Sequence, residues 1–558
     1  MTAADVVFMG GSIFSAGMAS SRSAALAVRN GRIAAVTDEV GIRDLVGPAT
    51  QVVDLAGGLL LPGFQDAHVH PVMGGIELGQ CNLSEASDAA DCLRLIEEFA
   101  AAHPDEEWIL GGGWSMDFFS GGTPTRSMLD AVVSDRPVFL MNRDHHGAWV
   151  STAAIRLAGL DRVTPDPSDG RIERERDGFP AGVMHEGAMN LFGTVRPAID
   201  AKTIYDGLLR GQAELFSWGV TAWQDALVGE ELGQPDTLDT YIHAATSGDL
   251  RGRVTAALWW QRHRGIEQVA DLVEKRARVR ARADPTRLVA GSVKLMIDGI
   301  AENFTAAMSS QYLDARRHPT GNAGLSFIDP DDLVTFVTAL DREGFQLHFH
   351  ALGDRAVTEV LDALAAARRA NGARDSRHHL AHLQVVADAD LDRFAELDAT
   401  ANLQALWAYA DAQLLDLTFP FLEQRLIDRH YPFGSLQRAG ARLAAGSDWP
   451  VSSPNPMAAI HVAVNRSISS EIAPLGANQE LDLATALTAY TAGSAFINNR
   501  DTNSGRLAKG YLADFAILDR DPFARPSHEI SLATVSSTWI DGRKVFDVTS
   551  PETAPTST

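Results

Sequence analysis

Two histidines one residue apart close the apolar run LLLPGFQDAHVH. On a β-strand, side chains at positions i and i+2 leave the same face, so His68 and His70 would project together. Two imidazoles that converge from one strand end are half of a metal site. The alternative is a polar strand end whose two histidines form hydrogen bonds with other groups. The rest of the chain helps to choose between these two interpretations.

Four further ionisable side chains lie in or at the ends of apolar, β-branched runs. Lys294 lies inside GSVKLMIDG, His350 ends LHFHALGD, His382 ends HHLAHLQ and Asp448 ends AAGSDWP. Imidazole and carboxylate groups suit a divalent ion, with zinc expected and iron, manganese or cobalt compatible. Lys294 as an ordinary salt-bridging residue and Asp448 as a purely structural ligand are the alternatives.

The elements that carry these residues predict a (β/α)₈ barrel, an α/β fold. Counting the run that ends in His70, eight apolar runs alternate with amphipathic helical stretches; the others are GVTAWQDA, RVTAALWW, LVAGSVKLMIDG, FQLHFHALGD, HHLAHLQVV, TANLQAL and RLAAGSDWPV. One helix is marked by Asp329 as N-cap and Pro330 at the first helical position. Active sites of such barrels lie at the carboxyl ends of the strands, which is where most of the candidate ligands fall.

Short alternating runs at both ends of the chain predict a small β-sandwich. Asn30-Gly31 and Asp541-Gly542 are strong hairpin signals, because these residues tolerate the positive φ of a two-residue turn. Neither end is large enough to hold a core alone. We therefore expect residues 1–60 and 507–548 to join into one sandwich.

The barrel itself is expected over residues 61–506, followed after the sandwich by a polar tail at 549–558. The stretch between His70 and Gly219 is far longer than a usual strand-to-helix connection. It has enough apolar content to fold. We expect residues 71–210 to form an inserted subdomain that acts as a substrate lid over the barrel mouth.

Composition narrows the class of protein. The 558 residues carry a formal net charge of −24, which disfavours binding to a nucleic acid. The two cysteines, Cys81 and Cys92, form no CxxC motif, which fits a reducing compartment without a disulfide framework. The first residues lack a basic segment before an apolar stretch, and no apolar run is long enough to span a bilayer. We expect a cytoplasmic protein with a small-molecule substrate and no membrane or nucleic-acid partner.

Several motifs resemble those of the amidohydrolase superfamily. PGFQDAHVH, VKLMIDG, HALGD and GSDWPV resemble its first-, fourth-, fifth- and eighth-strand motifs, and LAVRNGRIAAV and GRLAKGYLADFAILD fit its flanking pieces. DHHGAWVST and GVMHEGA resemble insert motifs of the branch that contains N-substituted formamide deformylases. The likeness covers nearly the whole chain. Members of this branch commonly pair, so a homodimer is expected.

The resemblance implies a metal-dependent hydrolase with one or two ions. His68, His70 and Asp448 would bind one ion, His350 and His382 a second, and a Lys294 carboxylated by carbon dioxide would bridge them. A lysine in an apolar strand has a depressed pKa, and only its neutral amine attacks carbon dioxide. The metal would lower the pKa of bound water, and the resulting hydroxide would attack a polarised carbonyl. Asp448 would act first as general base and then as general acid.

Six residues are candidate substrate contacts, and five of them have a simpler alternative. Glu186 lies in an apolar part of the insert but fits a solvated carboxylate, the loop histidines fit exposed polar groups, and the tryptophans fit core positions. The six are Trp114, His145, His146, Glu186, Asp298 and Trp407.

The expected reaction is hydrolysis of the C–N bond of a small N-acyl or N-formyl amine. The same fold could instead cleave an ester, a carbamate or a cyclic amide. Deamination is disfavoured, because superfamily deaminases place a glutamate three residues after the fifth-strand histidine, where this chain has Gly353. A non-hydrolytic reaction or a catalytically silent relative remains an alternative, although no expected ligand is missing.

Overall fold

The computed structural model describes residues 2–231, 235–476 and 478–549. The expected polar tail, apart from Thr549, therefore lies outside the described residues.

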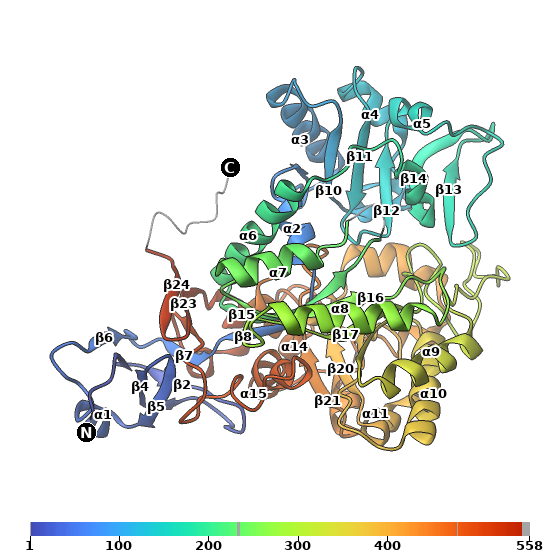
Figure 1. The fold of residues 1–558 in the computed structure, drawn as a ribbon. Helices are drawn as coiled ribbons and strands as arrows, with labels where there is room; N and C mark the ends of the chain where they lie inside the picture. The colour runs from blue at the N-terminus through green and yellow to red at the C-terminus, as the bar shows by residue number, and fades with distance from the viewer. Residues whose placement is uncertain (1, 232–234, 477, 550–558) are drawn as a thin grey trace.

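Eight parallel strands form the largest sheet and curl into a nearly closed barrel (Figure 1). Each strand pairs in parallel with the next along the chain. All eight strands expected from the sequence are present, so the α/β barrel prediction is confirmed. The strands are β8 (Phe64–Val69), β15 (Val220–Val228), β16 (Arg253–Trp259), β17 (Leu288–Met296), β18 (Gln346–Ala351), β19 (His379–His382), β20 (Thr400–Leu403) and β21 (Arg442–Ala445).

Two backbone hydrogen bonds draw the first and last strands together. Asp448 donates its amide to the carbonyl of His68 at 2.7 Å, and His70 donates to the carbonyl of Trp449 at 2.9 Å. Both bonds lie just beyond the carboxyl ends of β8 and β21. The ring is therefore joined at the edge where the candidate ligands lie.

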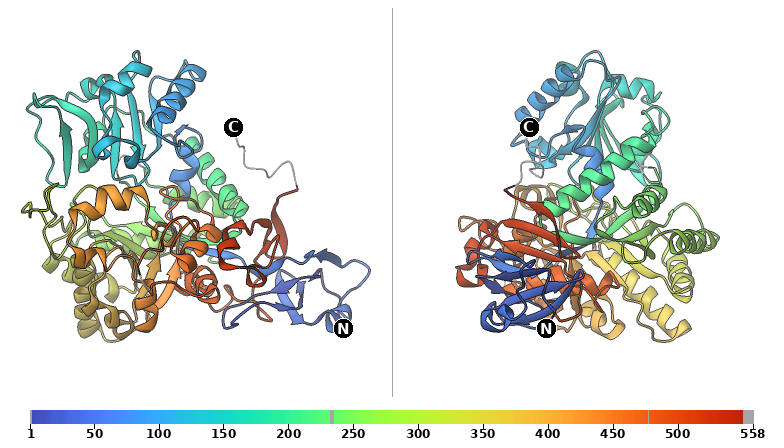
Figure 2. Two further views of the ribbon diagram at one scale, coloured as in Figure 1. Left: turned by 180° about the vertical axis from the view of Figure 1, so that it is seen from behind. Right: turned by 60° about the vertical axis from the view of Figure 1, so that its left-hand side comes forward.

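Helices cover the outside of the barrel, as the two views of Figure 2 show. The longer ones bury an apolar stripe against the strands, which is why their sequences read as amphipathic. The helix expected after Asp329 is confirmed: it begins at Pro330, and the Asp329 side chain accepts a hydrogen bond from the amide of Asp331. The covering helices are α7 (Leu238–Ser247), α8 (Gln268–Arg282), α9 (Pro330–Arg342), α10 (Asp354–Asn371), α11 (Leu391–Leu397), α13 (Phe433–Arg438), α14 (Pro456–Asn465), α15 (Leu483–Thr488) and α16 (Ser494–Ile497).

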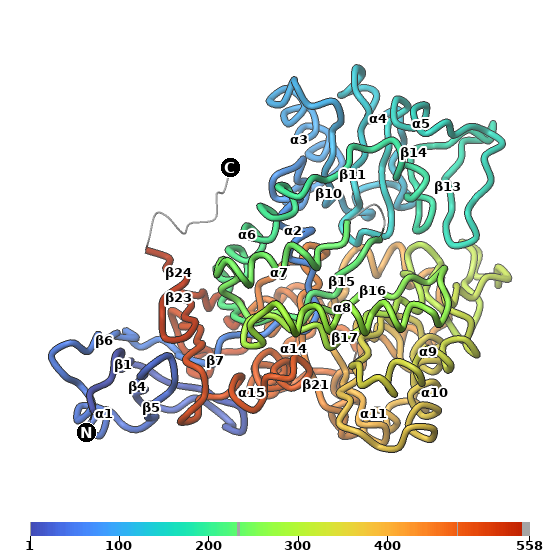
Figure 3. Tube along the Cα trace, in the orientation of Figure 1, coloured from blue at the N-terminus to red at the C-terminus, as the bar shows by residue number. Residues whose placement is uncertain are grey.

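Strands from the two ends of the chain share one six-stranded sheet, ordered β24-β23-β22-β7-β2-β3, which faces a four-stranded sheet ordered β5-β4-β1-β6. In Figure 3 the N-terminal and C-terminal segments lie side by side. Phe8 and Trp539 pack edge to face between the sheets, with ring centroids 5.1 Å apart. The strands are β1 (Val6–Met9), β2 (Ser12–Ile13), β3 (Arg22–Ser23), β4 (Ala25–Arg29), β5 (Arg32–Thr37), β6 (Gln51–Asp54), β7 (Leu59–Pro62), β22 (Phe515–Leu518), β23 (Val535–Ile540) and β24 (Arg543–Asp547).

Both expected hairpins are present in these sheets. Asn30 and Gly31 join β4 to β5 with φ values of 52° and 69°, and Asp541 and Gly542 join β23 to β24 with 52° and 71°. Two successive residues in the left-handed region match the twist of the flanking strands.

The long segment after β8 forms a separate six-stranded layer above the barrel mouth (Figure 2). Apolar clusters pack on both faces of this sheet. Its elements are β9 (Cys81–Asn82), α3 (Ala89–Ala102), β10 (Ile109–Trp114), α4 (Arg126–Val132), β11 (Val138–Asn142), β12 (Gly147–Val150), α5 (Thr152–Leu157), β13 (Gly170–Arg174) and β14 (Pro180–Glu186).

Two helices connect this layer to the barrel. The chain leaves the barrel through α2 (Pro71–Glu77) and returns to the barrel through α6 (Ala201–Ser217). Their backbones touch at glycines. A Cβ on Gly75 would collide with the carbonyl oxygen of Gly207, so the close crossing requires glycine at this point. Among the described residues, no helix has both the length and the apolarity needed to cross a membrane.

Candidate metal centre

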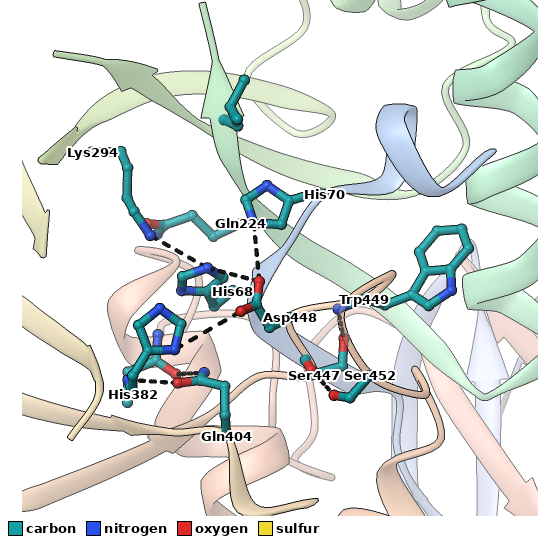
Figure 4. A network of polar contacts seen from close by, with 12 residues as sticks. His68, His70, Gln224, Lys294, His382, Gln404, Ser447, Asp448, Trp449 and Ser452 are labelled. Atoms are coloured by element: carbon teal, nitrogen blue, oxygen red, sulfur yellow. Dashed lines mark hydrogen bonds and ion pairs between the residues drawn. The ribbon is translucent and has the colours of Figure 1, made fainter. Parts of the chain in front are cut away.

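Three candidate ligands meet where the first and last barrel strands join. His68 lies in β8, His70 follows it, and Asp448 follows β21. Asp448 Oδ1 lies 3.1 Å from His68 Nε2 and 3.0 Å from His70 Nε2 (Figure 4). The spacing of two residues that suggested a shared face thus places both imidazoles against one carboxylate oxygen.

The remaining three candidate ligands lie beside this group. The ring of His382, at the end of β19, is 4.7 Å from that of His68 and 4.5 Å from that of His350, centroid to centroid. Lys294 Nζ, from β17, lies 3.3 Å from His68 Nε2. The structure therefore brings all six predicted metal-site residues into one buried cluster.

Unpaired polar atoms in this cluster fit a bound cation. Among the described residues, three buried ring nitrogens have no hydrogen-bond partner: Nδ1 of His70 and both ring nitrogens of His382. An unsatisfied buried polar atom costs about 1–3 kcal/mol. His68, His382 and Asp448 each offer a ligand atom, all within 4.8 Å of one another. A divalent ion would satisfy this donor set.

Burial sets the protonation states that a metal requires. Burial, helped by the nearby charge of Lys294, lowers the pKa of His68 to about 3. Burial also holds the pKa values of His350 and His382 well below the usual value. These imidazoles are therefore neutral at pH 7 and keep a free lone pair. The pKa of Lys294 falls to about 7 because its amine is buried.

Two of these residues have unusual backbone geometry. His382 has φ 80° and Asp448 has φ 57°, both in the left-handed region that disfavours residues with a Cβ. Such strain persists when the surrounding structure holds it and is concentrated at functional sites. The conformation turns both side chains toward the cluster at points where a regular strand would end.

A chain of buried polar groups crosses the barrel beneath the cluster. His348 Nε2 lies 2.9 Å from His68 Nδ1, and His348 Nδ1 lies 2.7 Å from Gln224 Oε1. An amide oxygen only accepts, so Nδ1 of His348 carries its proton and Nε2 accepts one from His68 Nδ1. This assigns to His68 the tautomer whose Nε2 lone pair faces Asp448.

The same chain continues to the other side of the cluster. Gln224 Oε1 also lies 3.1 Å from Nε2 of His379. The other ring nitrogen of His379, Nδ1, lies 3.2 Å from Asn402 Nδ2. Gln404 donates to Asn402 Oδ1 at 3.2 Å and accepts from the amide of His382 at 2.6 Å. One continuous network thus links the candidate ligand on β8 with that on β19.

A family model matches the chain that builds this cluster and its barrel. The model, described as "Amidohydrolase family", covers residues 51–546. The chain belongs to this family. The resemblance drawn from the strand-end motifs is thereby confirmed.

Two relatives span nearly the whole of this amidohydrolase. Protein LONG AFTER FAR-RED 3 of Arabidopsis thaliana is 30% identical over 551 residues, which cover 97% of this chain and 92% of that protein. N-substituted formamide deformylase of Arthrobacter pascens is 26% identical over 548 residues, which cover 96% and 97%. The solved structure of an uncharacterized metal-dependent hydrolase from Pyrococcus horikoshii OT3 has a TM-score of 0.71 at 23% identity, covering 94% of this chain and 99% of that one. At that identity the likeness establishes the fold.

The ligand cluster of this amidohydrolase lines a cavity of about 590 Å³ between the barrel and the inserted layer. Four of the six predicted substrate contacts also line it: His145, His146, Glu186 and Trp407. The indole of Trp407 stacks on the ring of His382, with an interplanar angle of 5°.

The two insert histidines are held by carboxylates. His145 Nε2 lies 2.7 Å from Glu77 Oε1, and His146 Nδ1 lies 2.9 Å from Glu186 Oε2. The hydroxyl of Thr305, in the loop after β17, donates to Glu186 Oε1 at 2.9 Å. The alternative of solvated loop groups therefore does not apply, because all of these contacts are buried or half-buried.

The other two predicted substrate contacts, Trp114 and Asp298, do not line the cavity. Trp114 lies in the core of the inserted layer, where its indole donates to the carbonyl of Leu140 at 2.9 Å. Asp298 is fully buried, accepts three backbone amides, and lies 3.3 Å from His350 Nδ1. Trp114 is thus a core residue, and Asp298 contacts the candidate ligand His350 instead of lining the cavity.

Several groups at the site carried no clear signal in the sequence. Gln224, His379 and Asn402 lie inside strands whose polar partners come from distant parts of the chain. Gln384 lines the cavity and follows His382 by two residues, and that spacing could have drawn attention to it.

Proposed function

We propose that this amidohydrolase hydrolyses the amide-type C–N bond of a small N-acyl or N-formyl amine at a divalent-metal centre. The observation that carries the proposal is the convergence of four imidazoles, Lys294 and Asp448 in one buried cluster that opens into a cavity. The 26% identity to N-substituted formamide deformylase supports the choice of bond.

The residues divide naturally into two ligand groups. His68, His70 and Asp448 would hold one ion, and His350 and His382 a second, with zinc the ion we propose. With a pKa of about 7, Lys294 has a neutral fraction that can combine with carbon dioxide and provide oxygens to both groups. The metal, when bound, supplies Lewis acidity that polarises a carbonyl and acidifies water.

Asp448 is the residue that would move the proton. Its carboxylate oxygen Oδ1 lies within 3.1 Å of the imidazoles of His68 and His70, and the residue lines the cavity. It would take a proton from the attacking water and give it to the leaving nitrogen. The water oxygen becomes part of the released acid, and the nitrogen leaves as an amine.

The inserted layer encloses the reaction from above. Asn303, in the loop after β17, donates to the carbonyl of His146 at 3.0 Å, next to the contact of Thr305 with Glu186. These bonds attach the insert to a barrel loop at the edge of the cavity. Enclosure excludes bulk water and strengthens electrostatic interactions at the reacting bond.

The test begins with protein purified without chelators. Metal analysis should find one or two ions per chain, and the loaded protein should release amines from a panel of N-acyl and N-formyl amines. Chelation should abolish the activity, and added metal should restore it. A metal-loaded protein that cleaves only the esters, carbamates or cyclic amides of the same panel would contradict the proposed bond.

The role of Asp448 has its own test. Asp448→Asn should keep most of the metal, because four imidazoles remain, and should lose turnover, because an amide cannot carry the proton. Metal content and amine release are measured on the same sample. Turnover equal to that of the unchanged protein would overturn the role.

A further inference from the structure

One part of the cavity contains a buried acceptor without a donor. Gln384 follows His382 by two residues, lines the cavity, and is 2% exposed. Its side-chain carbonyl oxygen has no hydrogen-bond partner among the described residues. A buried amide oxygen is stable only when a donor reaches it, and a substrate N–H group is one such donor.

Two carboxylates lie near the same part of the cavity: Tyr431, whose amide donates to the Gln384 backbone carbonyl at 2.8 Å, is influenced by the charges of Glu302 and Asp411. Glu302, in the loop after β17, and Asp411, in the loop after β20, both line the cavity. Glu302 accepts from the Thr418 hydroxyl at 2.6 Å, and Asp411 accepts from the amide of Leu414 at 2.8 Å. Within the described chain, neither carboxylate forms an ion pair with a lysine or arginine.

The charges that face these carboxylates are mostly of the same sign. Glu302 is repelled by Asp144 and Asp411, whereas Asp411 faces Asp117 and the single cation Arg143. Burial and this repulsion raise the pKa of Glu302 to about 7 and that of Asp411 to about 6. Negative charge in this part of the cavity is therefore poorly compensated by the protein itself.

Aromatic and aliphatic side chains form the walls between the acids and the ligand cluster. They include Leu406, Trp407, Tyr409 and Tyr431, and Trp407 connects the wall to His382 through its ring stack. Aromatic faces attract a desolvated ammonium group. An apolar stem could thus lie along these walls while a charged end reaches Glu302 and Asp411. We call this region the acidic arm; it comprises Gln384, Glu302, Asp411 and these four wall residues.

We propose that the acidic arm selects N-acyl amines whose amine substituent carries a second, positively charged nitrogen, that is, N-acylated diamines. The inference rests on the proposed function, because it names the substrate class of the same site. The substrate ammonium would donate its N–H groups to the carboxylates of Glu302 and Asp411 and to the side-chain carbonyl oxygen of Gln384. Substrates with a free carboxylate would be repelled by the same acids.

Three probes of similar length test the charge preference: N-acetyl-1,5-diaminopentane, N-pentylacetamide and N-acetyl-6-aminohexanoate. Binding is measured by calorimetry on the metal-loaded Asp448→Asn variant, so that no turnover is needed, and hydrolysis on the unchanged enzyme. We expect the ammonium probe to bind about tenfold more tightly than the neutral one, the effect of roughly one charge-assisted hydrogen bond, and the carboxylate probe to bind least.

Matched variants locate the preference. Glu302→Gln and Asp411→Asn should each reduce the ratio of ammonium to neutral binding, and together they should remove it. Asp416→Asn removes the same charge from an exposed position five residues beyond Asp411 that does not line the cavity, and it should leave the ratio unchanged. Gln384→Leu should weaken the binding of the ammonium probe more than the binding of the neutral probe.

Each outcome decides the inference. A preference for the neutral or carboxylate probe, or a preference that survives Glu302→Gln combined with Asp411→Asn, overturns it. If the ammonium probe binds as expected but no probe is hydrolysed by the unchanged enzyme, the acidic arm stands and the proposed C–N hydrolysis fails. If the neutral probe is hydrolysed best, the hydrolysis stands and the acidic arm fails.

Discussion

At the scale of single residues, burial prepares the cluster for a cation. A protonated imidazole cannot ligate a metal, and burial lowers the pKa of His68 to about 3, far from physiological pH. The same burial brings Lys294 to about 7, so its neutral form is substantially populated at neutral pH. Burying these side chains without a partner costs free energy. Burial also favours their neutral forms, and the neutral form is the one that can bind a metal ion.

The pKa of His146 changes in the opposite direction, because a neighbouring carboxylate outweighs the effect of burial. Burial alone would lower its pKa, but the charge of Glu186 raises it from 6.5 to about 9. His146 is therefore protonated at neutral pH. The ion pair stabilises the folded protein fully below pH 6.5, and this contribution is lost as the pH rises through about 9.

The pairing can be tested by removing the carboxylate. Glu186→Gln should lower the pKa of His146, because burial then acts without that opposing charge. An NMR pH titration of the imidazole protons measures the change. Glu77→Gln is the matched control, since Glu77 contacts His145, and it should leave His146 near 9. A His146 pKa that does not move in Glu186→Gln would refute the pairing.

At the scale of elements, the barrel strands contribute polar groups to their interior as well as ligands at their ends. Gln224 in β15 lies at the centre of the internal network and contacts His348 of β18 and His379 of β19. Because its oxygen can only accept, it fixes which ring nitrogen of His348 is protonated and, through His348, the tautomer of His68. The network thus positions one candidate ligand, His68 of β8, through a histidine of another strand, β18.

Removing the acceptor should loosen the metal site. Gln224→Met should weaken zinc binding by about 10- to 100-fold, the usual effect of losing a partner that orients a ligand. Competition with a chromophoric chelator measures this without any substrate. Ser292→Ala removes another contact of the same Gln224 oxygen, at 3.2 Å, but leaves His348 and His379 paired with that oxygen. The zinc affinity of this control variant should therefore stay close to that of the unchanged protein. Equal affinities in the two variants would contradict the relay.

Much of this arrangement is readable from the sequence, because strand-end residues combine a strong apolar run with a conspicuous polar group. The alternation rule predicted that His68 and His70 project together, and the apolar runs predicted the strands that carry Lys294 and His350. A strict two-residue alternation, which would put His378 and His382 on one face, does not hold in β19. There, His379 enters the barrel, while His378 contacts Asp341 on α9 at 3.2 Å.

The reason for that failure is local backbone geometry. The left-handed φ of 80° at His382 breaks the two-residue alternation, so His379 and His382 both serve the interior. Trp114 was misjudged for another reason: a tryptophan looks the same in a core as in a pocket wall. The hydrogen bond to the Leu140 carbonyl and the neighbouring indole of Trp149, 6.1 Å away, show that Trp114 lies in a core.

At the scale of the whole molecule, buried ion pairs attach the double sheet of the two chain ends to the base of the barrel. Arg253, the first residue of β16, donates to Asp514 and Asp541, each at 2.6 Å. Its side chain is 1% exposed, and that of Asp514 is 3% exposed. A buried guanidinium and its carboxylates thus connect segments that are distant in the sequence.

Breaking this junction should destabilise the protein. Arg253→Met should lower the free energy of unfolding by about 3–5 kcal/mol, because it leaves the charge of Asp514 buried without its partner. Asp541→Asn should cost less, about 1 kcal/mol, since that side chain is partly exposed and charge pairs near solvent are weak. Urea unfolding of the two variants measures the difference. Similar losses of unfolding free energy in Arg253→Met and Asp541→Asn would show that burial does not determine how much each ion pair stabilises the protein.

The sheet shared by the two chain ends has a consequence for how the molecule is made. β7 pairs with β2 on one side and with β22 on the other, and β22 lies near the opposite end of the chain. While a ribosome is still building the barrel, β7 therefore presents an open row of amide and carbonyl groups to its surroundings. Such an edge invites pairing with other nascent chains. We therefore expect this edge to be exposed to misassembly until β22 has been synthesised and can pair with β7.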